Sequence, residues 1–188
     1  VEKPKRAARS GLGLDPDRTT ILVSAGGFGV GPIEALVKSV QEIRHPVQVV
    51  VICGRNVQLE RRLNALSGMR HPTKIVGFTT EMDAWMAASD LLVGKAGGLT
   101  SAEALARGLV LVIVNPIPGQ EERNSDHFLE EGAAVRCNNL PALAYKIDSL
   151  LGDAGRFARM RENVRRTARP HAASDIVSIV LKGDVPAG

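Results

Sequence analysis

Short apolar runs that end in glycine alternate with helix-like segments about six times along this chain. The run TTILVSAGG at 19–27 precedes a segment, 31–43, whose apolar residues recur with the spacing of one helix face. The same succession begins again near residues 46, 73, 90 and 109, and it ends in a weak strand at 133–137. Such alternation predicts the α/β class, with a doubly wound, Rossmann-like parallel sheet of about six strands and helices on both faces.

Composition agrees with one domain of this class. Apolar residues make up 44% of the 188 residues but aromatic residues only 3%, so the core has to be built from Val, Leu, Ile and Ala, as in a buried parallel sheet. We expect residues 1–18 to be a linker from a missing N-terminal domain, 19–169 to be the domain itself and 170–188 to be a C-terminal tail. The first residue is Val rather than Met, which favours a piece of a larger protein.

The same data argue against several classes of function. A net charge of +4 is modest for this length, so no nucleic-acid partner is expected. Cys53 and Cys137 lack the spacing of a disulfide framework or zinc site, and we predict no metal and no cofactor. With no signal peptide and no apolar run of roughly 18 residues, a cytoplasmic location is expected, and peripheral membrane contact stays open. The arginine-rich stretch at 156–169 is either a solvated helix or a surface for anionic lipid or a phosphorylated partner.

The sharpest binding signal is the run KAGGLTSAE at 95–103, which joins a strand to a helix. Its two glycines leave the end of the strand without side chains, and Thr100 is placed to cap the helix. The N–H groups of residues 99–101 would then face an anion such as a diphosphate, which the helix dipole also favours.

Glu103 lies one turn into this helix and has two interpretations. Its carboxylate can accept hydrogen bonds from a ribose diol while phosphates occupy the helix tip. Alternatively, the spacing Thr100-x-x-Glu103 fits a capping box in which Glu103 serves its own backbone.

Three further segments carry weaker signals. The glycine-rich run AGGFGVG at 25–31 either approaches phosphates or is a tight turn without a ligand. As a dinucleotide-binding fingerprint it is poor, because the second strand ends in CGRN (53–56) and lacks the acidic residue that would hold a ribose. NAD is therefore disfavoured. The run PIPGQEERN at 116–124 offers donors and acceptors for sugar hydroxyls, or is an ordinary solvated helix start. In GFT at 77–79, the backbone suits a uracil edge, or Phe78 is simply packed.

In this order and at these intervals, the segments AGGFGVG, CGRN, VGF, KAGGLTSAEAL and PIPGQEERN resemble the C-terminal domain of GT-B glycosyltransferases over about residues 19–150. The families concerned are the plant-type monogalactosyldiacylglycerol synthases, the related bacterial diacylglycerol glucosyltransferases and the peptidoglycan N-acetylglucosaminyltransferase MurG. In them this domain, one half of the GT-B fold, is Rossmann-like and binds a UDP-sugar. Synthases of this type often carry KAGPGT where this chain has KAGGLT, an ending nearer to MurG, so the transferred sugar stays open.

The resemblance implies a role for each segment. Phe78 would meet the uracil, Glu103 the ribose, and residues 98–100 the diphosphate. The loop 27–29 would approach the phosphates or sugar from the other side, and three residues of the 116–124 segment would bind sugar hydroxyls. The full set of predicted substrate-binding residues is Gly27, Phe28, Gly29, Arg55, Asn56, Phe78, Thr79, Met82, Gly97, Gly98, Leu99, Thr100, Glu103, Gln120, Glu121 and Asn124.

The reaction implied is inverting transfer of a hexose from UDP to a hydroxyl of a lipid-like acceptor such as diacylglycerol, with the UDP-sugar as substrate and no obligatory metal. GT-B enzymes take the base and the acceptor pocket from an N-terminal domain, which these residues do not match. The catalytic residue is therefore unassigned, and the chain alone is expected to bind donor without turnover. Two alternatives remain: half of a UDP-sugar 2-epimerase, and a separate donor-binding subunit that docks on a membrane partner.

Overall fold

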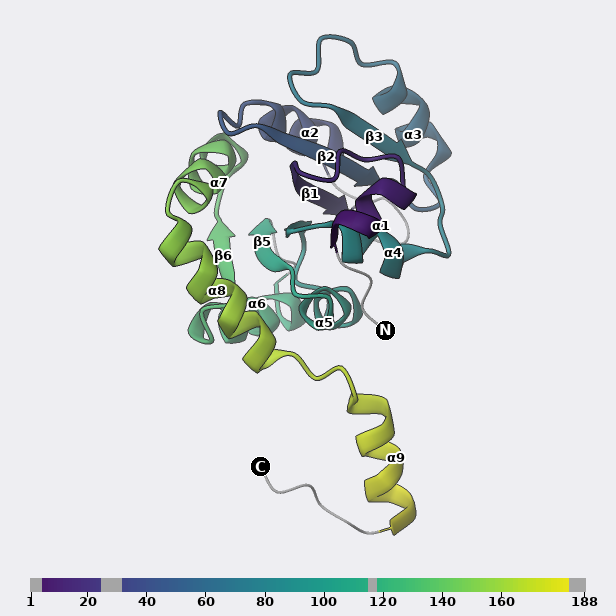
Figure 1. The fold of residues 1–188 in the computed structure, drawn as a ribbon, viewed down its shortest axis with the longest axis vertical. Coiled ribbons are helices and arrows are strands. Elements are labelled where there is room, and N and C mark those ends of the chain that lie inside the picture. Colours follow the sequence, from purple (N-terminus) through teal and green to yellow (C-terminus); the bar gives the residue numbers. More distant parts are fainter. Residues whose placement is uncertain (1–4, 25–31, 115–117, 183–188) are drawn as a thin grey trace.

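A parallel sheet at the centre of the fold positions the helices around it. The computed structural model describes residues 5–24, 32–114 and 118–182 (Figure 1). Six strands form one sheet in the order β3-β2-β1-β4-β5-β6, and each neighbouring pair is parallel. The strands are β1 (Thr19–Ser24), β2 (Val47–Ile52), β3 (Thr73–Val76), β4 (Leu91–Gly94), β5 (Val110–Val114) and β6 (Ala134–Cys137). The predicted fold class and the parallel sheet of six strands are confirmed.

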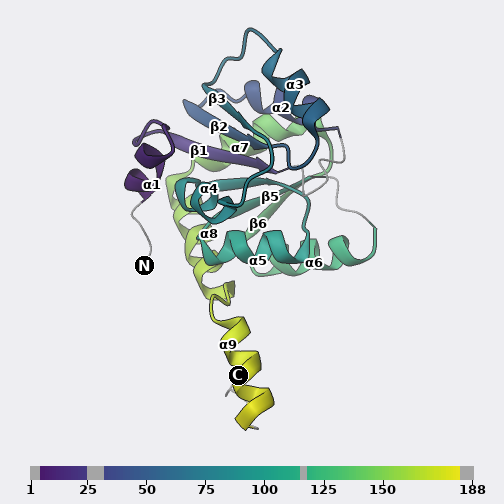
Figure 2. The ribbon, with the colours of Figure 1, turned by 90° about the vertical axis from the view of Figure 1, so that its right-hand side faces the viewer.

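Helices cover both faces of this sheet, as predicted (Figure 2). One face carries α2 (Ile33–Gln41), α3 (Val57–Asn64) and, after the short 3-10 helix η1 (Leu140–Ala142), α7 (Leu143–Leu151). The other face carries α4 (Met82–Ala88), α5 (Gly98–Ala106) and α6 (Gln120–Glu130). Helix α8 (Ala154–Thr167) contacts both α7 and α5 and so links the two layers.

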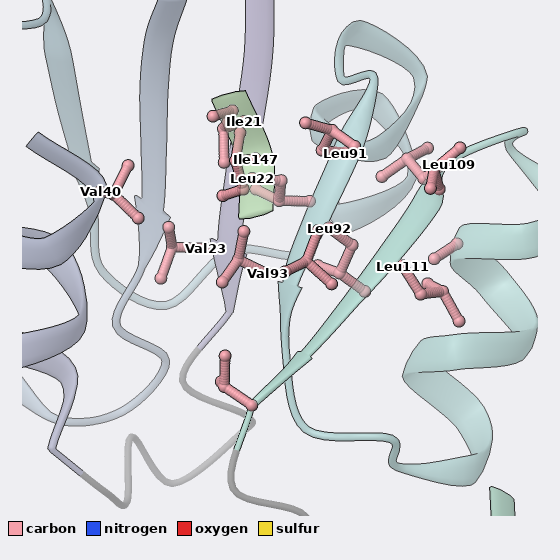
Figure 3. Packing of buried hydrophobic residues seen from close by; sticks show 14 of the residues in the cluster. Ile21, Leu22, Val23, Val40, Leu91, Leu92, Val93, Leu109, Leu111 and Ile147 are labelled. Atoms are coloured by element: carbon pink, nitrogen blue, oxygen red, sulfur yellow. The ribbon is translucent and has the colours of Figure 1, made fainter. Parts of the chain in front are cut away.

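Aliphatic side chains from strands and helices make up the core (Figure 3). Every residue of β2 and β5 is buried, which explains why these strands are almost unbroken apolar runs: a central parallel strand has no solvent-facing side. In the close-up, Val40 of α2 and Ile147 of α7 approach the side chains of β1 from one face. Leu111 of β5 is among the buried residues drawn beside a helix of the opposite layer.

The N-terminal segment departs from the linker expected for residues 1–18. Within it, α1 (Lys5–Gly11) packs against α4. Arg9 is buried, and its guanidinium pairs with the carboxylate of Asp90 at 2.5 Å. The same guanidinium donates to the carbonyl oxygens of Ala88 (2.9 Å) and Pro16 (3.1 Å), while Asp90 also accepts from the N–H of Thr20 (3.0 Å). The segment is thus attached to the amino edge of the sheet by a buried charge pair.

The predicted C-terminal tail contains a further helix, α9 (Ala172–Lys182), which extends away from the sheet in both views (Figures 1 and 2). Five of its aliphatic side chains are exposed: Ile176, Val177, Ile179, Val180 and Leu181. None of the helices in the described part of the chain has both the length and the apolar character to cross a membrane.

We expect Arg9→Ala to lower the free energy of unfolding by about 3 kcal/mol, because it leaves Asp90 buried without its main partner. The matched control is Arg6→Ala on the same helix, which removes only the exposed pair with Asp17 (3.0 Å) and should change stability by less than about 1 kcal/mol. Urea denaturation of the three proteins provides the comparison. Equal losses in both variants would show that the buried pair does not hold the segment.

Candidate ligand-binding site at the carboxyl edge of the sheet

The topology of the sheet makes the carboxyl end between β1 and β4 a switch point, the position at which open α/β sheets form a ligand-binding crevice. These strands are neighbours, but the chain leaves β1 toward β2 and leaves β4 toward β5. The loops that follow them therefore diverge, and ligands of open α/β sheets bind at such a switch point. The strand ends come close together, since a Cβ at Gly94 would lie 3.2 Å from the carbonyl oxygen of Ser24. A side chain at position 94 would require the backbone of Ser24 to shift by a few tenths of an ångström.

The first turn of α5 stands directly behind β4 with its amide groups uncapped. Its N-cap is Gly97, which has no side-chain cap, and the first intrahelical bond runs from the N–H of Ser101 to the carbonyl oxygen of Gly97 at 2.9 Å. The N–H groups of Gly98, Leu99 and Thr100 precede that bond and have no partner within the helix. An anion in the crevice would meet three free donors and the positive end of the helix dipole.

This helix begins earlier than predicted. Thr100 was expected to cap it, but the helix begins at Gly98 with Gly97 as its N-cap. The N–H of Ser101 was expected to face the ligand, but it is used inside the helix. The donors are therefore the amides of residues 98–100, one position earlier than predicted from the residues and the same three that the family resemblance implies.

The capping-box interpretation of Glu103 is wrong. A capping box places its acid at the third helical position, which here is Thr100, because the N-cap is Gly97. Glu103 is exposed on the next turn. Within the described ranges, no cation lies within ion-pair distance of its carboxylate and none of the hydrogen bonds involves its side chain. Its oxygens are therefore available to accept hydrogen bonds.

Helix α6 is fixed against the same loop. The side-chain amide of Asn124 donates to the carbonyl oxygen of Ala96 at 2.9 Å, and a Cβ at Gly98 would lie 4.0 Å from the same nitrogen. The structure thus brings together two predicted residues, Gly98 and Asn124, that are far apart in the sequence. Glu121, in the first turn of α6, is partly buried and takes part in an interaction within the protein.

Glu122 has a role that the predicted set missed. Its carboxylate accepts from the N–H of Gly119 (3.3 Å) and pairs with Arg136 (3.8 Å), so it fixes the first turn of α6. Gly119 has a φ of +95°, a backbone conformation that side chains disfavour. The spacing Gly119-x-x-Glu122, a small N-cap followed by an acid at the third position, is the signal that would have identified it.

On the other side of β1, an exposed cation–π pair follows the ends of β2 and β3. The ring of Phe78 is 62% exposed, and the guanidinium carbon of Arg55 lies 5.2 Å from its centroid. An apolar ring left this open beside a cation is unusual for packing alone. The packing-only interpretation of Phe78 therefore does not hold.

Three predicted neighbours of this pair make contacts within the protein. The side chain of Asn56 accepts from the N–H of Leu59 at 2.9 Å and caps α3. The hydroxyl of Thr79 accepts from the N–H of Glu81 at 3.0 Å and shapes the turn before α4. Met82 is partly buried and packs against the core. These residues position the edge, while Arg55 and Phe78 present side chains to solvent.

Four predicted positions remain without a description. Gly27, Phe28 and Gly29 lie outside the described residues, and so does the side chain of Gln120. Their predicted roles stay predictions.

The described part of this edge carries groups for binding rather than for covalent chemistry. Cys53, at the end of β2, is fully buried, and burial, together with the nearby Glu60, raises the pKa of its thiol to about 11. A buried protonated thiol is a poor nucleophile and a poor metal ligand. Among the described residues, no three His, Cys, Asp or Glu side chains are grouped to hold a metal ion.

Comparison with known families now decides the class of this domain. Residues 5–168 match the family described as "Glycosyl transferases group 1". The chain belongs to this family. The match begins at α1 and runs through α8, so it includes the N-terminal segment as well as the sheet.

Two relatives of this glycosyltransferase domain have diacylglycerol in their names. It is 38% identical over 177 residues to the probable monogalactosyldiacylglycerol synthase 3, chloroplastic, of Oryza sativa, covering 90% of this chain and 35% of the relative. It is also 38% identical over 171 residues to the processive diacylglycerol beta-glucosyltransferase of Staphylococcus saprophyticus, covering 89% of this chain and 43% of the relative. The chain therefore spans well under half the length of these two relatives, and the predicted family resemblance is confirmed.

Solved structures confirm the fold of the glycosyltransferase domain. Acinetobacter baumannii MurG matches with a TM-score of 0.73 and 22% identity, over 97% of this chain and 54% of that one. S. aureus MnaA, solved with UDP, matches with a TM-score of 0.68 and 14% identity, over 100% and 52%. At these identities the likeness concerns the architecture: this chain corresponds to one half of the GT-B fold.

Proposed function

We propose that this domain binds the UDP-hexose donor of an inverting glycosyltransferase that acts on a lipid-like acceptor such as diacylglycerol. The observation that carries the proposal is the uncapped first turn of α5 at the switch point, with the unpaired carboxylate of Glu103 one turn further on. The amides can donate hydrogen bonds to a diphosphate, and the carboxylate can accept hydrogen bonds from the hydroxyls of a ribose. The names of the relatives, which transfer sugars to diacylglycerol, support the acceptor class.

In the reaction, negative charge develops on the departing UDP. The amides of Gly98, Leu99 and Thr100 are fixed by the helix, so they stabilise that charge without having to reorganise. Glu103 accepts hydrogen bonds from the ribose hydroxyls, and Phe78 offers its open ring to the uracil. Held at both ends, the donor presents its sugar toward α6, where Glu121 and Asn124 stand.

The remaining parts of the reaction lie outside this chain. The acceptor hydroxyl has to lose a proton, and no group in the described edge is placed as its base. We infer that base and acceptor pocket come from the portion of the longer relatives that this chain does not span. The amides supply the electrostatic stabilisation, and no obligatory metal is required. We propose peripheral contact with the membrane, which the diacylglycerol in the names of the relatives supports.

A UDP-sugar 2-epimerase is the second candidate function. A putative UDP-N-acetylglucosamine 2-epimerase from Listeria monocytogenes shares the fold, with a TM-score of 0.67 and 18% identity over 87% of this chain. A glycosyltransferase releases UDP and extends an acceptor, whereas an epimerase returns a UDP-sugar of changed stereochemistry. Product analysis of the full-length protein, given UDP-N-acetylglucosamine in one reaction and UDP-hexose with diacylglycerol in another, separates the two.

Calorimetric titration of the chain with UDP, UDP-glucose and UDP-galactose tests donor binding directly. We expect saturable binding of all three, without added divalent metal and unchanged by a chelator. A folded domain, verified by circular dichroism, that binds none of them at millimolar concentration would rule the proposal out.

We expect Glu103→Ala to weaken UDP binding by roughly 1–3 kcal/mol, or about 5- to 150-fold in Kd, because hydrogen bonds from the ribose to a charged acceptor are lost. Glu130→Ala removes an equally exposed carboxylate at the far end of α6 and serves as the control. Binding of thymidine diphosphate and uridine monophosphate to the same variants shows which part of the ligand is affected. An unchanged Kd in Glu103→Ala would remove the ribose assignment.

Phe78→Ala should weaken UDP by about 1–3 kcal/mol, the range for a base that stacks on an aromatic ring. Phe78→Tyr keeps the ring and should keep the affinity. Fluorescence or calorimetric competition with uridine measures the effect on the base alone. Should alanine and tyrosine bind uridine equally well, the ring does not contact the base.

A further inference from the structure

A cavity of about 420 Å³ lies at the opposite, amino edge of the sheet and plays no part in the proposed donor site. Its walls come from α1, from the C-terminal ends of α4 and α5, and from α8, which are far apart in the sequence. Its volume is within the range of small-molecule sites. Leu105 and Pro170 contribute apolar surface to the walls.

Four basic side chains line this cavity: Lys5, Arg107, Arg161 and Arg165. Arg161 and Arg165 are four residues apart on α8, so they lie on the same face of that helix. The arginine-rich stretch found in the sequence is thereby divided, because its first two members, Arg156 and Arg159, line a different hollow together with Gly132.

The carboxylates around the cavity do not balance these cations. Asp90 is shared between Lys5 (3.6 Å) and the buried Arg9. Asp83 pairs with Arg107 at 3.4 Å. Burial lowers the pKa of Lys5, and although Asp90 opposes this, the positive charges of Arg161 and Arg9 lower it further. The surroundings of Lys5 therefore hold an excess of positive charge.

The excess is concentrated on α8. Arg165 pairs with Glu162 at 2.8 Å, but both side chains are mostly exposed, and such pairs are weak and easily exchanged. Arg161 is half-buried, and among the described residues no carboxylate lies within ion-pair distance of it. An arginine at the cavity wall without a paired carboxylate adds positive charge there, which favours an anionic ligand.

Capping of helix ends does not account for these two arginines. At the end of α4, the carbonyl oxygen of Ser89 already accepts a hydrogen bond from Lys5, and the carbonyl oxygen of Ala88 accepts one from Arg9 at 2.9 Å. Within the described ranges, neither Arg161 nor Arg165 donates to a helix carbonyl. Among the described residues, the guanidinium of Arg161 is therefore available to a ligand, and that of Arg165 is held only by its exposed pair with Glu162.

We propose that this cavity binds a phosphate group, held by the forked donors of Arg161 and Arg165 with Lys5 and Arg107 completing the positive wall. Guanidinium groups match phosphate oxygens in pairs, which a single ammonium does not. The apolar walls fit a ligand whose phosphate is attached to a carbon chain. A soluble phosphate monoester and the head group of an anionic phospholipid share this chemistry.

The test uses the 188-residue chain and two kinds of probe. Inorganic phosphate and glycerol 3-phosphate are titrated while amide chemical shifts of residues 105–108 are followed. Separately, sedimentation measures binding to phosphatidylcholine vesicles with and without phosphatidic acid. Saturable shifts with the soluble probes identify phosphate itself as the ligand. Sedimentation only with the phosphatidic acid vesicles identifies the lipid as its source. If neither probe binds the unmodified chain, the proposal is overturned.

Paired variants separate the cavity from net charge. Arg161→Ala/Arg165→Ala should weaken the binding seen in either assay about tenfold or more, since charge-assisted hydrogen bonds are lost. Arg156→Ala/Arg159→Ala removes the same charge from the same helix but outside the cavity, and should leave binding unchanged. Equal losses in the two double variants would overturn the proposal. Glutamine at positions 161 and 165 replaces alanine if thermal unfolding shows that alanine disturbs the fold.

Discussion

The structure depends on one constraint, the placement of β4 beside β1. A parallel sheet needs crossover helices, and when the chain returns to the centre of the sheet and winds outward in the other direction, the loops on the two sides of the centre separate. These two strands pair directly, and the absence of a side chain at Gly94 leaves room for the backbone of Ser24. The crevice is thus a consequence of topology, and it exists before any ligand-binding side chain is considered.

The residues around the crevice divide into those that hold the edge in place and those that face solvent. Asn124, Glu122 and Asn56 each form a hydrogen bond with a backbone group and so fix loops and helix starts. The open groups are the amides of α5, the carboxylate of Glu103 and the ring of Phe78. This division is what a preorganised site requires, because donors that are already oriented need no rearrangement when charge appears on the ligand.

The sequence predicted the sheet well because burial on both faces leaves a simple signal, a run of aliphatic residues ending in glycine. It predicted helix starts less well. Whether Gly97 or Thr100 is the N-cap of α5 depends on where the backbone first becomes helical. The residue types in this run do not decide that. Helix α1 was missed because it has few apolar residues and is stabilised by Arg9 and Asp90, a pair separated by 81 positions in the sequence. The open ring of Phe78 depends on exposure, which is likewise a property of the folded chain.

Helix polarity explains why the two edges of one sheet treat anions so differently. Every crossover helix points its positive N-terminus to the carboxyl edge, so the backbone alone makes that edge attractive to phosphates. The amino edge receives the negative C-termini, which draw cations such as Lys5 and Arg9 onto their carbonyl groups. An anion can therefore bind at the amino edge only where there are more basic side chains than the helix C-termini already engage. Arg161 and Arg165 are that surplus, and their placement on a helix that links both layers gives them a fixed position at this edge.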